Sequence, residues 1–165
     1  MSNNHIYFSI IVVSLNTKKK LQKTLESIYA QEIYNKNYEI IVVDGLSNDG
    51  TLEEILKSND KIDKLIIEKD SGIYDAMNKG IKHARGEWVI FLNSGDLFYE
   101  NDILQKIYSL KLGESDVIYG NTLVNNNNLK YKVDGKNLND NSINIPFCHQ
   151  SSFVKGYLLK KYNFN

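Results

Sequence analysis

Gly86-Glu-Trp-Val-Ile-Phe-Leu-Asn-Ser-Gly-Asp96 decides how this chain folds. Its apolar residues, 88–92, form a short run between glycines, which is typical of a strand covered on both faces of a parallel sheet. Ligands of open α/β sheets bind just beyond the carboxyl ends of such strands. Asp96 occupies that position, so we expect a chemical centre there.

Length and charge narrow the class of protein. The 165 residues suffice for one domain, and their formal net charge is zero. A neutral balance argues against nucleic acid or an anionic membrane as the main partner. Arg85 is the single arginine, so a phosphate ligand would need a metal ion, backbone amides or lysines. Cys148 is the single cysteine, which excludes an internal disulfide and fits a reducing compartment such as the cytoplasm.

Strands and helices alternate through the first hundred residues. Short β-branched runs end in polar turns, and the segments between them place apolar residues at helical spacing. This order predicts a parallel sheet with right-handed crossovers. The expected strands are residues 7–13, 39–44, 65–68 and 88–92, and the expected helices begin near residues 17, 51 and 73.

The helix starts carry more specific expectations. Thr17 is placed to cap the first helix, and Thr51 and Glu54 have the spacing of a capping box. The inward face of the third helix is expected to consist of Ile73, Met77, Ile81 and Ala84.

The second half of the sequence is less regular. A helix around residues 103–107 and strands at 116–120 and 122–124 are expected, followed by a hairpin through 125–128 to 130–133. Residues 135–144 are polar and predict a mobile loop. Residues 145–154 are mixed in character, and residues 156–162 are typical of a helix.

Polar residues follow each of the four expected strands, and a parallel sheet brings such residues to one edge. The acidic members of this set are Asp44, Asp70, Asp75 and Asp96. Isolated carboxylates at strand ends suit a divalent cation that keeps several waters and binds a substrate's phosphates. The alternative is structural: Asp44 and Asp70 form Asx turns, and Asp75 favours a helix N-terminus. Spacing alone leaves both open.

Several other chemistries lack their sequence signatures. The chain contains no P-loop, no glycine-rich dinucleotide fingerprint after the first strand and no nucleophile elbow. Its three histidines do not have the spacing of zinc ligands.

Four segments, in order and spacing, carry a resemblance to a known family. They are Ser9–Asn16, Glu39–Thr51, Glu68–Gly80 and Gly86–Asp96. Together they resemble the family 2 glycosyltransferases, the inverting group with the GT-A fold, and in particular the branch that builds bacterial surface polysaccharides. Residues 147–154 are similar to the acceptor-side segment of that branch. The resemblance implies a three-layer α/β/α architecture with a mostly parallel, Rossmann-like sheet.

The resemblance also implies roles for individual residues. One group would hold the base and ribose of a nucleotide-sugar: Ser14, Leu15, Asn16 and Asp44. A second group would line the nucleotide and sugar pocket: Asp70, Gly72, Tyr74, Asp75, Asn78, Asn93, Ser94 and Gly95. Asp96 would coordinate Mg²⁺ or Mn²⁺ on the diphosphate. Many relatives have Asp at the positions of Asn93 and Gly95 and Tyr at that of Leu15, which changes the metal, ribose and nucleobase contacts.

The implied reaction moves a sugar from a UDP-linked donor to a hydroxyl of a saccharide or lipid-linked saccharide, with inversion and with a divalent metal. It would take place in the cytoplasm, with peripheral contact at the inner face of the membrane where the acceptor is lipid-linked. Residues 7–96 would form the donor half and residues 97–165 part of the acceptor half of one C-terminally truncated domain. His149 and Asp134 are the candidates for the general base. The alternative is a non-catalytic or degenerate nucleotide-binding domain.

Overall fold

The fold is known from a computed structural model, which describes residues 5–34, 37–110, 112–126, 129–135 and 148–165. The mobile loop predicted for residues 135–144 and the start of the mixed segment 145–154 fall on residues 136–147, which lie outside the described part. The strands are β1 Phe8–Ser14, β2 Tyr38–Asp44, β3 Lys64–Ile67, β4 Trp88–Phe91, β5 Val117–Tyr119, β6 Thr122–Asn126, β7 Leu129–Val133 and β8 Ser152–Lys155. The helices are α1 Lys18–Tyr29, α2 Thr51–Lys57, α3 Ile73–His83, α4 Ile103–Tyr108 and α5 Gly156–Lys161, with short 3₁₀ turns η2 Asn59–Lys61 and η3 His149–Ser151.

Six strands form one sheet in the order β3-β2-β1-β4-β8-β5. The first four are parallel, as the sequence predicts, and β1 lies between β2 and β4 with Ser14 opposite Asp44 and Phe8 opposite Trp88. β8 pairs antiparallel with both β4 and β5. The chain therefore returns from its C-terminal region to extend the parallel sheet beyond β4, which the sequence does not predict.

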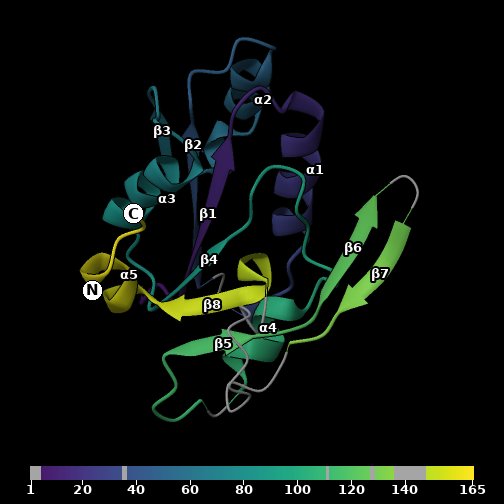
Figure 1. The fold of residues 1–165 in the computed structure, drawn as a ribbon, viewed down its shortest axis with the longest axis vertical. Coiled ribbons are helices and arrows are strands. Elements are labelled where there is room, and N and C mark those ends of the chain that lie inside the picture. The colour runs from purple at the N-terminus through teal and green to yellow at the C-terminus, as the bar shows by residue number, and fades with distance from the viewer. Residues whose placement is uncertain (1–4, 35–36, 111, 127–128, 136–147) are drawn as a thin grey trace.

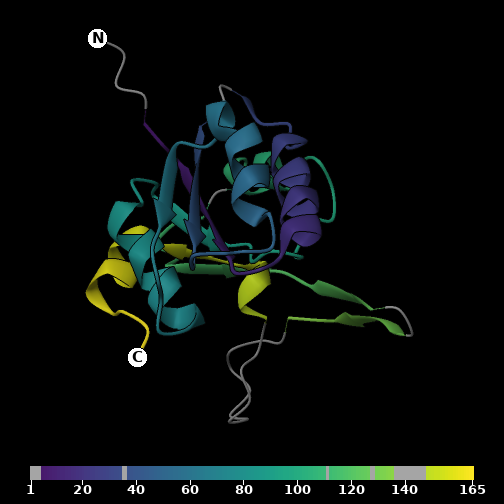
Figure 2. The same cartoon turned by 90° about the horizontal axis from the view of Figure 1, so that it is seen from above.

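Helices cover both faces of the sheet, as Figures 1 and 2 show. On one face Leu21, Leu25 and Ile28 of α1 pack with residues of α2 and α4, as the helical spacing indicates. On the other face Met77 and Ile81 of α3 pack with residues of α5 and the strands. The expected three-layer α/β/α architecture is confirmed.

Three side chains at helix starts differ from what the sequence predicts. Thr17 occupies the N-cap position of α1, as expected, but its side chain makes no capping bond, because its hydroxyl pairs with that of Ser14 at 2.9 Å. The second helix is capped by Gly50 rather than Thr51, whose amide and hydroxyl both donate to Asp49. Ile73 is 47% exposed, because it begins α3 at the open edge of the sheet, where little of the core lies beneath it.

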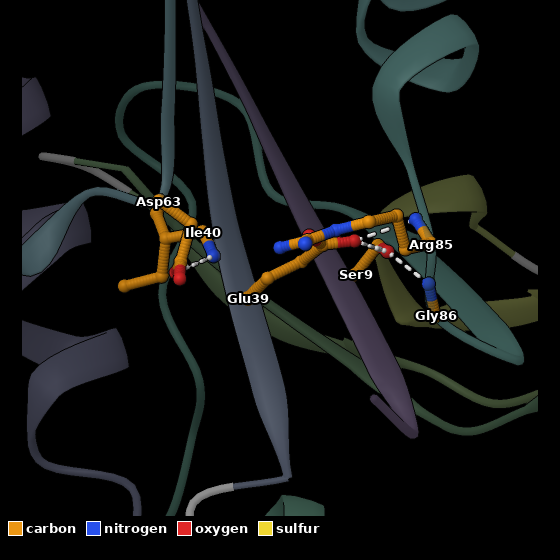
Figure 3. Close-up of polar contacts among 6 residues, drawn as sticks. All are labelled: Ser9, Glu39, Ile40, Asp63, Arg85 and Gly86. Carbon is orange, nitrogen blue, oxygen red and sulfur yellow. Dashed lines mark hydrogen bonds and ion pairs between the residues drawn. The ribbon is translucent and has the colours of Figure 1, made fainter. Parts of the chain in front are cut away.

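A buried carboxylate, that of Glu39, joins three strands at their amino ends, and its ion-pair partner, Arg85, has an exposed side chain (Figure 3). The Glu39 carboxylate accepts hydrogen bonds from the Ser9 hydroxyl at 2.6 Å and from the Arg85 backbone amide at 2.6 Å. The Arg85 guanidinium donates to it through Nε at 2.9 Å and Nη2 at 2.8 Å. Ser9 Oγ in turn accepts the Gly86 amide at 2.8 Å. This network fixes the end of α3 and the start of β4 to the sheet, at the edge opposite the polar loops.

β6 and β7 form a separate two-stranded sheet that projects from the body of the molecule (Figures 1 and 2). The expected hairpin is therefore confirmed, with Thr122 opposite Val133 at its base. None of its described residues belongs to the buried core. Among the described residues, no helix has the length and apolar character needed to cross a bilayer.

Candidate functional site

The loops after β1 and β2 are joined by a set of hydrogen bonds. The Asn16 amide donates to Ser47 Oγ at 2.8 Å, and the Asn48 amide donates to Asn16 Oδ1 at 2.9 Å. Asn16 has a φ of +51°, a left-handed conformation that Asn tolerates better than most residues. The backbone is thus held in a fixed shape at the point where a ligand of this edge would approach.

The loop after β3 joins the same group. A Cβ atom on Gly45 would lie 2.4 Å from Asp70 Oδ2 and 3.2 Å from Leu15 Cδ1, so a side chain there would displace both neighbours. Residues that follow three different strands therefore meet at Gly45. The expectation that the polar loops gather at one edge of the sheet is confirmed.

The acidic residues of these loops form the turn and helix-start hydrogen bonds that the sequence leaves open as the alternative to a metal site. Asp44 is fully buried, and its two oxygens accept the amide and the hydroxyl of Ser47, each at 2.7 Å. Asp70 accepts the Gly72 amide at 3.2 Å. Asp75 accepts the Ser71 amide at 2.9 Å, and this bond together with Lys79 lowers the pKa of its carboxyl. All three carboxylates therefore stabilise the backbone of these loops, independently of any ligand that the loops bind.

The corner after β4 is supported from below by β1 and α1. The Ser94 amide donates to the Val13 carbonyl at 3.1 Å, and the Gly95 amide donates to Thr24 Oγ1 at 2.8 Å. The aliphatic stem of Lys20 lies over Gly95, where an added Cβ would meet Lys20 Cδ at 3.3 Å. Lys20 and Thr24 belong to α1, about seventy residues earlier, so no local sequence pattern indicates this support.

Asp96 is half-buried at this corner. Burial raises the pKa of its carboxyl, and the nearby charge of His149 opposes the rise. Beside it, Asn93 Oδ1 and Ser94 Oγ are buried and have no hydrogen-bond partner. Buried oxygen atoms without partners are uncommon in folded proteins and point to a missing donor or cation.

The donor set at this corner fits Mg²⁺ or Mn²⁺. A carboxylate, an amide oxygen and a hydroxyl are hard oxygen ligands, which both ions prefer. Nowhere in the described part of the chain do three or more His, Cys, Asp or Glu side chains converge. The protein would therefore supply few ligands, and substrate phosphates and water would supply the others.

Two of the expected pocket residues contact the C-terminal segment. The Asn78 side chain donates to the Phe164 carbonyl at 2.8 Å and accepts the Phe164 amide at 3.0 Å. The Tyr74 ring stacks on the Phe164 ring, with centroids 5.4 Å apart. A cavity of about 500 Å³ remains there, lined by Ser71, Gly72, Ile73, Tyr74, Asp75, Asn78, Phe164 and Asn165.

The two base candidates lie in different places. His149, in η3, is close enough to Asp96 to affect its pKa. Asp134 follows β7 and forms an ion pair of 2.6 Å with Lys132, and 67% of its side chain is exposed. The structure thus places the neighbours of His149, Cys148 and Gln150, in the lining of the same groove as Asp96, while the Asp134 side chain is exposed and paired with Lys132.

A groove of about 930 Å³ opens beside Asp96. Gly95 and Asp96 line one part of it, and the remainder comes from β4 and the segment after it, α4, β5, the hairpin, η3 and β8. Of its lining, the sequence pointed only to Gly95, Asp96 and the acceptor-side segment 147–154. A further sign was the run Leu97-Phe-Tyr99, whose outer two side chains are more than half exposed.

The chain is similar in sequence to known proteins. The family model described as "Glycosyl transferase family 2" matches residues 9–160. A PGL/p-HBAD biosynthesis glycosyltransferase of Mycobacterium tuberculosis (strain ATCC 25177 / H37Ra) is 35% identical over 155 residues, which are 90% of this chain and 59% of that protein. The poly(ribitol-phosphate) beta-N-acetylglucosaminyltransferase TarP of Staphylococcus aureus (strain N315) is 34% identical over 132 residues, 78% of this chain and 37% of that protein.

Solved structures have the same fold. S. aureus TarS 1-349, in complex with UDP-GlcNAc, superposes with a TM-score of 0.75 at 24% identity, over 94% of this chain and 47% of that one. The mannosyltransferase PcManGT of Pyrobaculum calidifontis, in complex with GDP-Man and Mn²⁺, gives a TM-score of 0.71 at 21% identity, over 98% of this chain and 48% of that one. The expected GT-A fold is confirmed, and the chain spans about half the length of these structures.

Proposed function

The chain belongs to glycosyl transferase family 2, and from this premise we propose that it transfers a sugar from a nucleotide-sugar to an acceptor hydroxyl, with inversion. UDP is the favoured nucleotide, and the acceptor is a saccharide or a lipid-linked saccharide of the bacterial cell envelope. The reaction is assigned to the cytoplasm, at the inner face of the membrane where the acceptor is lipid-linked. The observation that carries the proposal is the corner at Asp96, where the unpartnered oxygens of Asn93 and Ser94 lie beside the end of β1, whose loop meets the loops that follow β2 and β3.

Three loops form the donor side in this proposal. The turn Ser14-Leu-Asn16 and the Asp44 turn present backbone and side-chain groups to the base and ribose, and their mutual bonds keep them in place before the ligand arrives. The segment from Asp70 to Asn78 borders the nucleotide and sugar. Because Leu15 is half exposed and touches the Gly45 turn, it offers an apolar surface to the nucleobase without an aromatic ring.

Asp96 would hold the metal ion on the donor diphosphate, with Asn93 and Ser94 as neighbouring oxygen ligands. When bound, a divalent ion stabilises the negative charge that develops on the leaving phosphate. The neutral chain has one arginine, and it is committed to Glu39, so this charge would otherwise lack a strong cationic partner.

The acceptor hydroxyl attacks the sugar from the face opposite the diphosphate and loses its proton to a base. Of the two candidates, His149 is the better placed, since it adjoins the Asp96 corner while Asp134 is paired with Lys132. In this proposal His149 orients the attacking hydroxyl on the acceptor side of the site.

One observation favours a second candidate function, nucleotide binding without turnover. The described residues provide a single carboxylate at the metal corner and no cluster of three acidic, histidine or cysteine side chains. A degenerate domain of the family would have this donor set. The two candidates predict the same nucleotide binding and differ only in the release of UDP from UDP-GlcNAc when acceptor saccharides are added.

Binding is tested by thermal unfolding with UDP or GDP, each with and without MnCl₂. A ligand present at one hundred times its dissociation constant stabilises the native state by about 2.7 kcal/mol. We expect UDP to raise the melting temperature, and Mn²⁺ to increase the effect in the wild type and not in Asp96→Asn. Asp60→Asn, which changes an exposed carboxylate before β3 at the opposite edge, is the matched control. An Asp96→Asn variant with the full Mn²⁺ effect would remove the metal assignment.

A further inference from the structure

Two residues other than glycine have a left-handed backbone in the described part of the chain, and they lie in two loops that are bonded to each other. Asn16, after β1, has a φ of +51°, and Leu46, after β2, has a φ of +67°. Asn adopts this conformation readily, because its short polar side chain can bond to nearby backbone groups. For a bulky apolar side chain such as that of Leu46 the conformation is strained.

Hydrogen bonds on both sides of Leu46 fix this turn. The buried Asp44 carboxylate accepts the amide and the hydroxyl of Ser47, each at 2.7 Å. The Gly45 amide donates to the Ser14 carbonyl at 3.0 Å. None of these bonds uses the Leu46 side chain. Strained conformations persist where the surrounding structure imposes them, and they gather at sites that hold ligands.

The Leu46 side chain contributes little to the packing of the fold. It is 52% exposed and belongs to neither of the two apolar cores of the described residues. Burial of this side chain in the protein therefore does not offset the strain of its backbone. A ligand that covers the side chain would offset it.

Leu15 provides a second exposed apolar surface at the same turn. It is 50% exposed, and its Cδ1 atom lies 3.2 Å from the position that a Cβ atom on Gly45, the neighbour of Leu46, would take. The Asn16 amide joins the two loops by its bond to Ser47 Oγ at 2.8 Å. Two half-exposed leucines on loops of fixed shape suit the flat apolar face of a ring.

We propose that the strained turn holds Leu46 in position to cover the nucleobase of the donor, next to Leu15. The inference rests on the proposed function and adds to it a contact residue that lowers the stability of the free protein. A residue kept for packing and a residue kept for a ligand differ in one measurable respect. Removal of the Leu46 side chain should weaken nucleotide binding and at the same time stabilise the protein.

The variant Leu46→Gly removes both the side chain and the steric conflict. Without ligand its melting temperature should rise by about 3 °C, because relief of the strain exceeds the added chain entropy of glycine. Its dissociation constant for UDP in the presence of Mn²⁺, measured by titration calorimetry on the full chain, should increase about eightfold, since about 50 Å² of apolar contact is lost. A lower melting temperature or an unchanged affinity for UDP would overturn the proposal.

Three controls assign the effect to contact with the base. Inorganic pyrophosphate has no base and should bind Leu46→Gly as it binds the wild type. Leu46→Met keeps an apolar side chain and should bind UDP within about twofold of the wild type. Leu56→Gln changes an exposed leucine of α2 and should alter neither measurement. An eightfold loss in Leu46→Met as well, or an equal loss for pyrophosphate in Leu46→Gly, would contradict the proposal.

The outcomes separate this inference from the proposed function. If the wild type and Leu46→Gly bind UDP equally well, the inference fails alone. If neither UDP nor GDP binds the wild type, the proposed function fails, and uridine, which carries the base without phosphates, then decides the inference. Saturation-transfer NMR should show uridine bound to the wild type and less of it bound to Leu46→Gly, and any other result refutes the role of Leu46.

Discussion

At the scale of single residues, Glu39 shows how much one buried charge can depend on its partners. Its side chain is almost fully buried, and it accepts four hydrogen bonds from Ser9 and Arg85. Removal of a buried carboxylate from such a network leaves several donors unsatisfied at once. In the sequence Glu39 reads as an ordinary first residue of a strand, because its partners lie 30 and 46 residues away.

We expect Glu39→Ala to lower the free energy of unfolding by about 3 kcal/mol, at about 1.5 kcal/mol for each of the two hydrogen bonds that the buried carboxylate accepts from the Ser9 hydroxyl and the Arg85 backbone amide. Glu39→Gln should lose less, because an amide oxygen can still accept from Ser9 and from the Arg85 backbone. Urea denaturation followed by circular dichroism measures both.

Glu114→Ala removes an exposed carboxylate of a loop and should change the free energy of unfolding by less than about 0.5 kcal/mol. If Glu39→Ala proved no more destabilising than this control, the network of Figure 3 would not contribute to stability.

In the candidate site, too, residues with a local sequence signal could be predicted, and residues that act through contacts distant in sequence could not. Asp96 and its loop were predicted at the end of β4, because an apolar run followed by Asn-Ser-Gly-Asp is visible within ten residues. Lys20 and Thr24, which support that loop, could not be predicted, since nothing local relates α1 to Gly95. The groove could not be predicted for the same reason.

At the scale of elements, the parallel strands were the most predictable part. β1, β2 and β4 consist mostly of β-branched and aromatic residues, because both faces of the sheet are covered by helices. β8 has the mixed sequence Ser-Phe-Val-Lys, which carries no such pattern. Its position is set by pairing with the free edge of β4 and with β5, a tertiary choice that periodicity does not encode.

α3 makes an element-scale contact that is testable. Asn78 forms two hydrogen bonds with the backbone of Phe164 and so fastens the C-terminal segment across the helix. We expect Asn78→Leu to lower the free energy of unfolding by about 1–2 kcal/mol, because it removes two hydrogen bonds that each contribute about 1 kcal/mol or less net. Carboxypeptidase should also remove residues 163–165 faster from the variant, as followed by mass spectrometry.

Lys82→Leu changes an exposed residue on the same helix and should leave the rate of trimming unchanged. Equal trimming of the Asn78→Leu variant and the wild type would mean that the ring contacts of Phe164 with Tyr74 and Phe91 suffice to hold the segment.

At the scale of the whole molecule, the chain consists of a covered sheet and a hairpin that extends from it (Figure 2). The sheet contains the buried side chains of both cores, while the described residues of β6 and β7 are exposed or half-exposed. An isolated two-stranded hairpin is at best marginally stable in water. The hairpin is therefore expected to exchange its amide hydrogens earlier than β1, β2 and β4 do.

This difference predicts that the hairpin is dispensable for folding. Its two ends are close together, since the Gly135 amide donates to Asn121 Oδ1 at 3.0 Å, so a Gly-Gly link can replace residues 122–133 without moving β5. We expect the free energy of unfolding of the shortened chain to lie within about 1 kcal/mol of the wild-type value. A change in the length of a connection has little effect on stability, and no core residue is lost. UDP should stabilise it as before, since the donor loops are at the other side of Asp96. Calorimetric unfolding of this one variant, with and without UDP, measures both effects. A loss of more than about 3 kcal/mol would instead make the hairpin a structural part of the domain.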